Sequence, residues 1–295
     1  QFDTSVPGYP MAVIQPGQDV SLPYGEAVTD ADLKPYVDKV ATAVTVGPVP
    51  EAQIEEKLLP QLAMRVGDAI NMDYIRHDLH VIGATGLFST VKPAFTTVPE
   101  GVALNYTVQM NPVVKKIDIV GNESISTADL MKLVATTPGT TLNTAVVSHD
   151  VANINSAFAN AGYMMSRVSD VRLDDEGTLH IAISEPRIEN INLRGNTKTK
   201  NKVIMRELRM KKGDIFNKNA ASRSIQRVYN TGYFEDVNVR LLPGQRNPKD
   251  VIVEIDVTEQ KTGSVTIGAG YSDSDGLVGI LGLAETNLRG TGDKA

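Results

Sequence analysis

The chain has 295 residues, a net charge of −6 and no cysteine, which excludes a disulfide-stapled scaffold and a thiolate zinc site. A hydrophobic fraction of 41% supports ordinary packed cores, and 5% aromatic residues without tryptophan predict that these cores are aliphatic. The length suggests two or three domains, and no apolar run is long enough for a transmembrane helix.

The charge is distributed unevenly. Residues 187–259 hold 15 of the 29 Lys and Arg but only 9 of the 35 Asp and Glu, so this segment carries +6 and the remainder −12. With few aromatic residues interleaved, a solvated helix face is the default interpretation, and no nucleic-acid partner is expected. The alternative is contact with anionic lipid headgroups or an acidic accessory subunit. The candidate residues for that contact are Lys198, Lys200, Lys202, Lys211 and Lys212.

Residues 1–36 contain five prolines and three glycines, a density that disfavours both helices and central strands. They are predicted to form an N-terminal arm. Hydrophobic periodicity beyond this arm then predicts strand, helix, helix, strand, strand three times over. The three copies span residues 37–111, 112–186 and 187–259. Two helices on one face of a three-stranded sheet can bury one small core, so the sequence predicts an α+β protein with three tandem domains.

The three copies share two landmarks at the second helix. An asparagine lies four residues after a glycine and is predicted to cap the helix N-terminus, and a later glycine ends the helix. The intervals from asparagine to glycine are 15, 19 and 15 residues, and the longer interval adds about one helical turn, which keeps the buried face in phase. These repeat positions are Asn71 and Gly86, Asn143 and Gly162, and Asn217 and Gly232.

The pattern changes within residues 260–295. Two strand-length segments near 263–271 and 277–288 carry almost no charge, and large apolar residues alternate with glycine, serine and threonine. This alternation is typical of transmembrane β-barrel strands. Because two strands cannot close a barrel, the natural chain is expected to continue past Ala295. A hairpin packed on the third copy is the alternative.

These patterns together resemble the POTRA domains and first barrel strands of the outer-membrane barrel-assembly family, the BamA type. The resemblance rests on residues 114–122 and 188–196 at the domain starts, on 213–216 and on 232–237. Asn287, Leu288, Arg289 and Gly290 resemble an early barrel motif of this family. The resemblance implies a location in the bacterial outer membrane, with residues 1–259 in the periplasm. It also implies unfolded outer-membrane β-barrel proteins as clients, accessory subunits as further partners, and lipid contact through the barrel.

In the resembling family, the strand after the second helix is an exposed edge to which an extended client can add. Such an edge offers unpaired backbone groups with little demand on client sequence, although a solvated edge without a client is the alternative for any one of them. By position, these strands are residues 89–95, 164–173 and 234–242. The candidate client-binding residues are Thr90, Val91, Met164, Val168, Phe234, Val237, Val239 and Leu241.

No catalytic or cofactor-binding pattern stands out. His77 and His80 share a helix face with Asp73, but nothing nearby supplies a further metal ligand, so a surface cluster is favoured. We therefore expect neither enzyme activity nor a cofactor. The alternatives to a general assembly factor are a TamA-type or two-partner-secretion-type transporter for few partner proteins, and a periplasmic scaffold.

Overall fold

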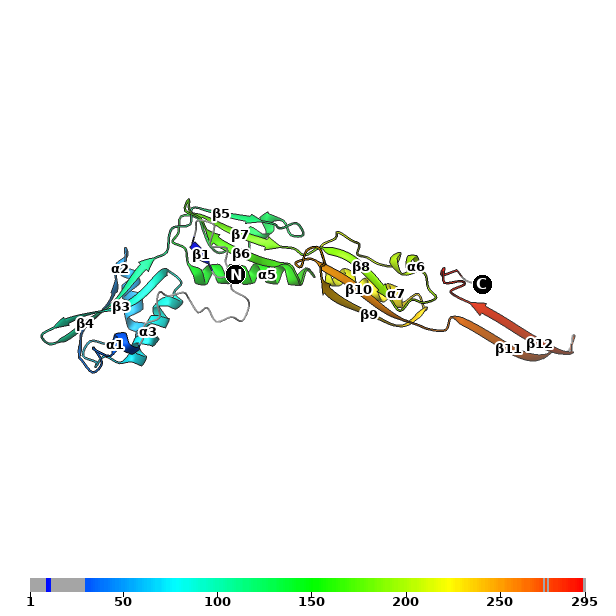
Figure 1. Ribbon diagram of the computed structural model, residues 1–295, viewed down its shortest axis with the longest axis horizontal. Coiled ribbons are helices and arrows are strands. Elements are labelled where there is room, and N and C mark those ends of the chain that lie inside the picture. Colours follow the sequence, from blue (N-terminus) through cyan, green and yellow to red (C-terminus); the bar gives the residue numbers. More distant parts are fainter. Residues whose placement is uncertain (1–8, 12–29, 273, 275, 294–295) are drawn as a thin grey trace. The chain divides into compact units, whose positions relative to one another are not determined.

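The computed structural model describes residues 9–11, 30–272, 274 and 276–293 (Figure 1). It divides into two compact units, one of residues 1–156 with 168–183 and the other of 157–167 with 184–295. The first unit contains two strand–helix modules, and the second contains a third module and a separate hairpin. Residues 1–8 and 12–29 of the predicted arm, and residues 294–295 of the predicted barrel segment, lie outside the described residues.

The first module has a three-stranded sheet in the order β2-β4-β3, with β2 parallel and β3 antiparallel to the central β4. Its core is aliphatic apart from a few rings, and Ile75 and Ile82 of the long helix pack among the buried strand residues. The elements are β2 (Ala41–Gly47), α2 (Ala52–Leu58), the 3-10 helix η1 (Leu59–Gln61), α3 (Met72–Ala84), β3 (Phe88–Val98) and β4 (Gly101–Met110).

The second module repeats this arrangement and adds one strand. The order β1-β6-β7-β5 places the last strand, β7, between β5 and β6, and a short strand from the N-terminal arm pairs with the outer edge of β6. The elements are β1 (Tyr9–Met11), β5 (Lys116–Val120), α4 (Thr127–Met131), α5 (Thr144–Asn160), β6 (Arg167–Leu173) and β7 (Thr178–Ser184).

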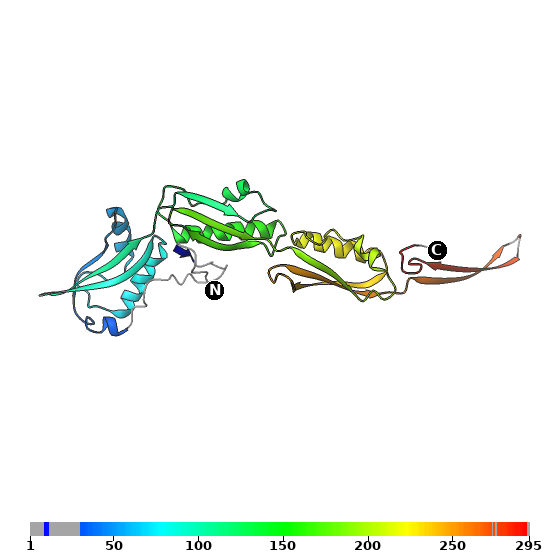
Figure 2. The ribbon, with the colours of Figure 1, turned by 45° about the horizontal axis from the view of Figure 1, so that its top comes forward.

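The third module has the order β8-β10-β9, with the last strand again central. In Figures 1 and 2 the long helix of each module lies against one face of its sheet. The α+β class and the repeated strand-helix-helix-strand-strand order are therefore confirmed. The elements are β8 (Ile188–Arg194), α6 (Asn201–Met205), α7 (Lys218–Tyr229), β9 (Phe234–Pro243) and β10 (Val251–Glu259).

Each long helix begins at a capping asparagine. The side chains of Asn71 and Asn217 each accept two backbone N–H groups of the first helical turn, and Asn143 does the same for Ala145 and Val146. These bonds satisfy donors that have no partner within the helix. The glycines after the helices, Gly86, Gly162 and Gly232, all have positive φ, as the sequence predicts for helix-ending residues.

Seven residues after each capping asparagine, a buried polar side chain of the long helix accepts backbone N–H groups from the loop that precedes the helix. Asp78 accepts the N–H of Met64 and the hydroxyl of Tyr106, at 3.1 and 2.6 Å. Asp150 accepts the N–H of Ala135 at 2.7 Å, and in the third module the hydroxyl of Ser224 accepts the N–H of Arg209 at 2.8 Å. Buried polar groups need such partners, so this position links the long helix to the preceding loop in all three modules.

The predicted N-terminal arm contains more regular structure than its proline content indicates. Residues 30–33 form the short helix α1 (Asp30–Leu33), and Leu33 is buried in the first core, so the arm joins that module before residue 36. Pro35 follows the helix at a place where proline commonly ends one. The strand β1 contains Pro10, which the edge of a sheet can accept because one of its sides needs no N–H.

The final segment forms an antiparallel hairpin of β11 (Gly263–Ser272) and β12 (Gly276–Glu285). One face pairs Val265 with Leu283 and Ile267 with Leu281, and these four side chains are 65–81% exposed. They are therefore not packed on the third module, which the alternative interpretation of this segment requires. None of the helices in the described ranges has the length and apolar character needed to cross a membrane.

Candidate functional site

The edge strand β9 of the third module has one side without a strand partner, as β3 of the first module does, among the described residues. Only β10 pairs with it among the described residues, so its other side carries backbone groups without a strand partner. Phe234 and Val237 point into the core at 2% and 7% exposure, Val239 is half-buried and Leu241 is 40% exposed. Only the backbone and the outer residues of β9 are therefore available to a client.

The direction of the backbone groups on β9 follows from one hydrogen bond. The N–H of Val237 donates to the carboxylate of Asp236 at 3.0 Å. Because successive N–H groups alternate in direction along a strand, the N–H of Val239 points to the same side as that of Val237. We infer that this side is the free edge.

A buried carboxylate holds β9 against the rest of its sheet. Glu254 on the central strand is 3% exposed and lies 2.8 Å from Arg194 on β8 and 2.6 Å from Arg240 on β9. Arg240 also lies 2.8 Å from Asp256. A buried carboxylate requires such partners, and here they link both outer strands to the centre.

The predicted residues on the other two edge strands have mixed positions. On β3, Val91 is buried and Thr90 is half-buried. In the second module Val168 is buried, whereas Met164 lies in a turn before β6 and is 58% exposed. The strand therefore begins at Arg167, three residues later than the sequence indicates. The edge of β6 is occupied by β1.

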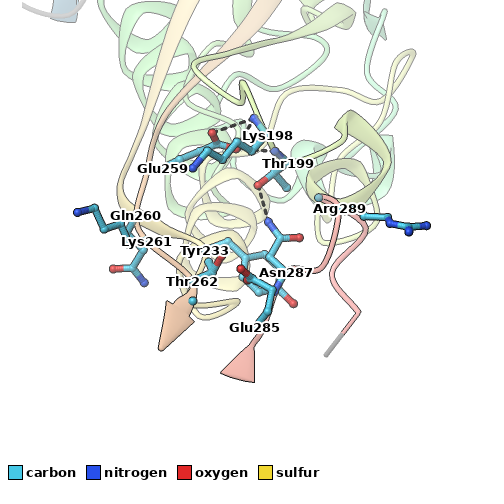
Figure 3. A pocket seen from close by; sticks show the side chains of 12 residues that line it. Lys198, Thr199, Tyr233, Glu259, Gln260, Lys261, Thr262, Glu285, Asn287 and Arg289 are labelled. Carbon is cyan, nitrogen blue, oxygen red and sulfur yellow. Dashed lines mark hydrogen bonds between the residues drawn. The ribbon is translucent and has the colours of Figure 1, made fainter. Parts of the chain in front are cut away.

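A second cluster lies where the third module meets the hairpin (Figure 3). The carboxylate of Glu259, at the end of β10, accepts the N–H groups of Thr199 and Lys198 at 2.6 and 2.9 Å and the hydroxyl of Thr197 at 2.7 Å. Burial opposes ionisation of Glu259, but these donors outweigh it and lower the pKa of the carboxyl to about 2. The loop after β8 is thus fixed to the end of β10.

The predicted barrel motif docks on this same loop. Asn287, 8% exposed, donates from Nδ2 to the hydroxyl of Thr199 at 2.8 Å, and the carbonyl of Gly290 accepts the N–H of Lys200 at 2.9 Å. Gly290 has φ +72°, and a Cβ there would lie 1.9 Å from the carbonyl oxygen of Lys198. Only glycine therefore permits this contact without a backbone shift.

Residues 287–292 also form hydrogen bonds among themselves and with Tyr233. Asn287 accepts the N–H of Gly292 at 2.9 Å, and the carbonyl of Gly292 accepts the hydroxyl of Tyr233 at 3.2 Å. Leu288 is 40% exposed, and Arg289 has a positive φ and an exposed side chain. The residues of this junction line a pocket of about 490 Å³, in which Asn287 and Thr199 point toward one another (Figure 3).

The predicted lysines do not form one patch. Lys198, Lys200 and Lys202 are exposed around the loop after β8. Lys211 and Lys212 are exposed beside Gly213, whose N–H donates to Ile188 at the start of β8. The two groups therefore lie at opposite ends of a seven-residue strand, about 20 Å apart.

Sequence reasoning missed Glu259, Glu254 and the buried position seven residues after each capping asparagine. The last had a detectable signal, because Asp78, Asp150 and Ser224 recur at the same offset. Glu259 had none, since its partners lie about 60 residues away in sequence. Among the described residues, no cluster of three or more His, Asp or Glu is arranged to hold a metal ion.

The repeated three-stranded sheets with two helices define a class of small α+β module, and comparison with known proteins agrees. The family described as "POTRA: Surface antigen variable number repeat" matches residues 112–185 and 186–260, just over half of the chain. The chain belongs to this POTRA family, of the kind found in BamA-type outer-membrane assembly factors.

Individual relatives extend the similarity beyond these residues. The outer membrane protein assembly factor BamA of Neisseria meningitidis is 31% identical over 61% of this chain, and the match spans about a quarter, 24%, of that relative. The N-terminal domain of Omp85 from Thermosynechococcus elongatus aligns with a TM-score of 0.64 and 25% identity, covering 76% of this chain and 98% of that structure. POTRA domains 1–3 of Omp85 from Anabaena align with a TM-score of 0.63 and 25% identity over 76% of this chain and 96% of theirs.

Proposed function

We propose that this chain is the receptor portion of an outer-membrane protein assembly factor. In this proposal its POTRA modules lie in the periplasm, bind unfolded β-barrel clients by strand addition, and pass them to a barrel that begins with β11 and β12. The observation that carries the proposal is the open edge of β9, in the module that directly precedes the hairpin. The name of the Neisseria relative supports the same role.

Strand addition explains how one surface can serve many clients. The bonds come from backbone groups that every extended chain possesses, so the edge places little demand on client sequence. A disordered client loses conformational entropy when it pairs, so affinity for any one client is weak. Weak and general binding is what a handover step requires.

The same proposal assigns the remaining partners. The exposed apolar face of the hairpin contacts outer-membrane lipid. The lysines around the loop after β8, which lie close to the hairpin junction, contact anionic headgroups or an acidic accessory subunit. No residue has a catalytic role, and no cofactor takes part.

Substitution of Val239 by proline tests strand addition at β9. It removes an N–H that points to the free edge and leaves the ladder to β10 intact, so we expect client affinity to fall at least about tenfold while the unfolding free energy changes by about 1 kcal/mol or less. Affinity is measured with an unfolded outer-membrane β-barrel protein diluted from urea.

Two matched variants separate the loss of the edge N–H from the loss of the valine side chain and from a general loss of stability. Val239→Ala changes the side chain and keeps the N–H, and it should bind clients as the wild type does. Asn238→Pro removes an N–H directed at β10 and should destabilise the module by about 1–3 kcal/mol. A folded Val239→Pro protein with wild-type client affinity would refute strand addition at this edge.

A further inference from the structure

The second module differs from the other two in what lies on its edge strand. Residues 9–11 pair antiparallel with β6, with Tyr9 opposite Leu173, Pro10 opposite Arg172 and Met11 opposite Val171. In the other two modules, no strand within the described ranges covers the outer side of β3 or β9. The edge of β6 therefore accepts an extended segment, and the segment that occupies it belongs to this chain.

The register shows which kind of segment this edge accepts. The occupant is extended and antiparallel, and it places a proline opposite Arg172. Proline has no N–H, so a pairing that tolerates it depends on the backbone groups of its neighbours. The edge thus binds a short extended strand without requiring a donor from every residue.

The pairing is short enough to be displaced. It covers three residues, and its few hydrogen bonds must offset about 1–2 kcal/mol of conformational entropy for each residue that becomes ordered. Covalent connection favours the pairing, because residues 12–29 join β1 to the first module in the sequence. Short connections of this kind give effective concentrations in the millimolar range. An intramolecular occupant of this type excludes weak competitors and yields to longer strands.

We propose that residues 9–11 act as a built-in occupant of the client-accepting edge of the second module, which a client strand must displace before it can bind there. This inference rests on the proposed function, since it assumes that clients add to such edges. It makes the edges of β3 and β9 freely available sites and the edge of β6 one that must first be vacated.

The absence of cysteine allows a direct test in the full chain. Pro10 and Arg172 lie opposite each other, so the double variant Pro10→Cys with Arg172→Cys can lock the arm on β6 by a disulfide. Photocrosslinkers at Asp170 on β6 and at Asn238 on β9, both exposed, report client contact at the two edges. The probe is an unfolded outer-membrane β-barrel protein diluted from urea.

Oxidation should reduce client crosslinking at position 170 at least about tenfold and leave position 238 unchanged. Deletion of residues 1–11 should raise crosslinking at position 170 several-fold. Equal yields at position 170 in oxidised and reduced protein, with crosslinking intact at position 238, would overturn this inference alone. Absence of crosslinking at both positions in every variant would overturn the proposed function as well.

Backbone hydrogen exchange, measured without a client, tests whether residues 9–11 cover the edge of β6. The deletion should accelerate exchange of the backbone amides within Val171–Leu173 that face β1, while amides of β9 keep their rates. In the crosslinking experiment, the single variant Pro10→Cys, which cannot form the intramolecular disulfide, controls for the substitution. Unchanged exchange on deletion would show that the arm does not cover β6, and the inference would be wrong.

Discussion

Glu259 shows how one side chain fixes a loop on which a second segment depends. Its carboxylate holds the N–H groups of Lys198 and Thr199, and Thr199 then presents its hydroxyl to Asn287. The ionised carboxylate of Glu259 therefore supports the loop conformation on which Asn287 docks. Hydrogen bonds to a charged acceptor contribute more than neutral ones, so this carboxylate stabilises the junction more than a neutral side chain would.

Glu259→Gln should destabilise the second unit by about 1–2 kcal/mol at pH 7, because solvent at this half-buried site weakens bonds to a charged acceptor. The folded-state pKa of about 2 lies below the ordinary value of 4.5, so the stabilisation is complete above pH 4.5 and is lost as the pH falls toward 2. Urea unfolding of both proteins at several pH values measures the difference.

Glu235→Gln, at an exposed site on β9, is the matched control and should show no such pH dependence. A stability difference between wild type and Glu259→Gln that stays constant from pH 7 to pH 3 would contradict the role given to the carboxylate.

Where consecutive modules join, the glycine that ends one long helix contacts the N-terminus of the next long helix. The carbonyl of Gly86 accepts the N–H of Thr144, and the carbonyl of Gly162 accepts the N–H of Lys218, both at 2.8 Å. Asn217 also donates to the carbonyl of Ala161 at 3.1 Å. The glycine that ends one helix thus packs on the N-terminus of the next, which explains why both landmarks recur together.

Gly162→Ala tests this contact against a matched glycine. Gly162 and Gly213 have φ of +92° and +91°, so alanine is strained at both, by about 1–2 kcal/mol. At Gly162 the new Cβ would also lie 2.7 Å from the side-chain oxygen of Asn217, whereas nothing lies within 4 Å at Gly213. We expect Gly162→Ala to cost about 1 kcal/mol more than Gly213→Ala in thermal or urea unfolding, the value of a helix cap. Equal losses would show that the contact contributes nothing to stability.

Elements with a local signal could be predicted from the sequence, and elements formed by distant segments could not. Alternation along β9 and β10 and the spacing from Asn217 to Gly232 appear within one short window, so strands, caps and helix ends were predictable. The pairing of β1 with β6 joins residues about 160 positions apart and leaves no periodic trace. A four-residue helix such as α1 likewise falls below the length at which periodicity is visible.

The candidate site was predictable only in part, for the same reason. Alternation correctly placed Val237 on the core side of β9, but it could not show that β6 is already occupied. The sequence also grouped five lysines that the fold separates to the two ends of β8. Proximity in a sequence does not establish proximity on a surface when a strand lies between the groups.

At the scale of the whole molecule, three modules of one fold offer three edges, of which two are open and one is covered within the described ranges. The edges of β3 and β9 have no strand partner among the described residues, and the edge of β6 is covered by the chain's own arm. The third module contacts the predicted barrel motif through Asn287 and Gly290. In the proposed function, the third module is therefore the one from which clients pass to the barrel.

The same architecture is compatible with two kinds of client range. A general assembly factor uses sequence-tolerant strand addition for many barrel proteins, whereas a transporter of the two-partner-secretion or TamA type serves few partners. Open backbone edges favour the first, because they select for extended conformation and not for side chains.

Depletion of this protein in its own cells, followed by a quantitative inventory of the outer membrane, tests the proposed function most directly. The account predicts a broad loss of many unrelated β-barrel proteins, restored by the wild-type protein and by Val239→Ala but not by Val239→Pro. Loss of a single exported protein, with the other barrels at normal levels, would contradict it.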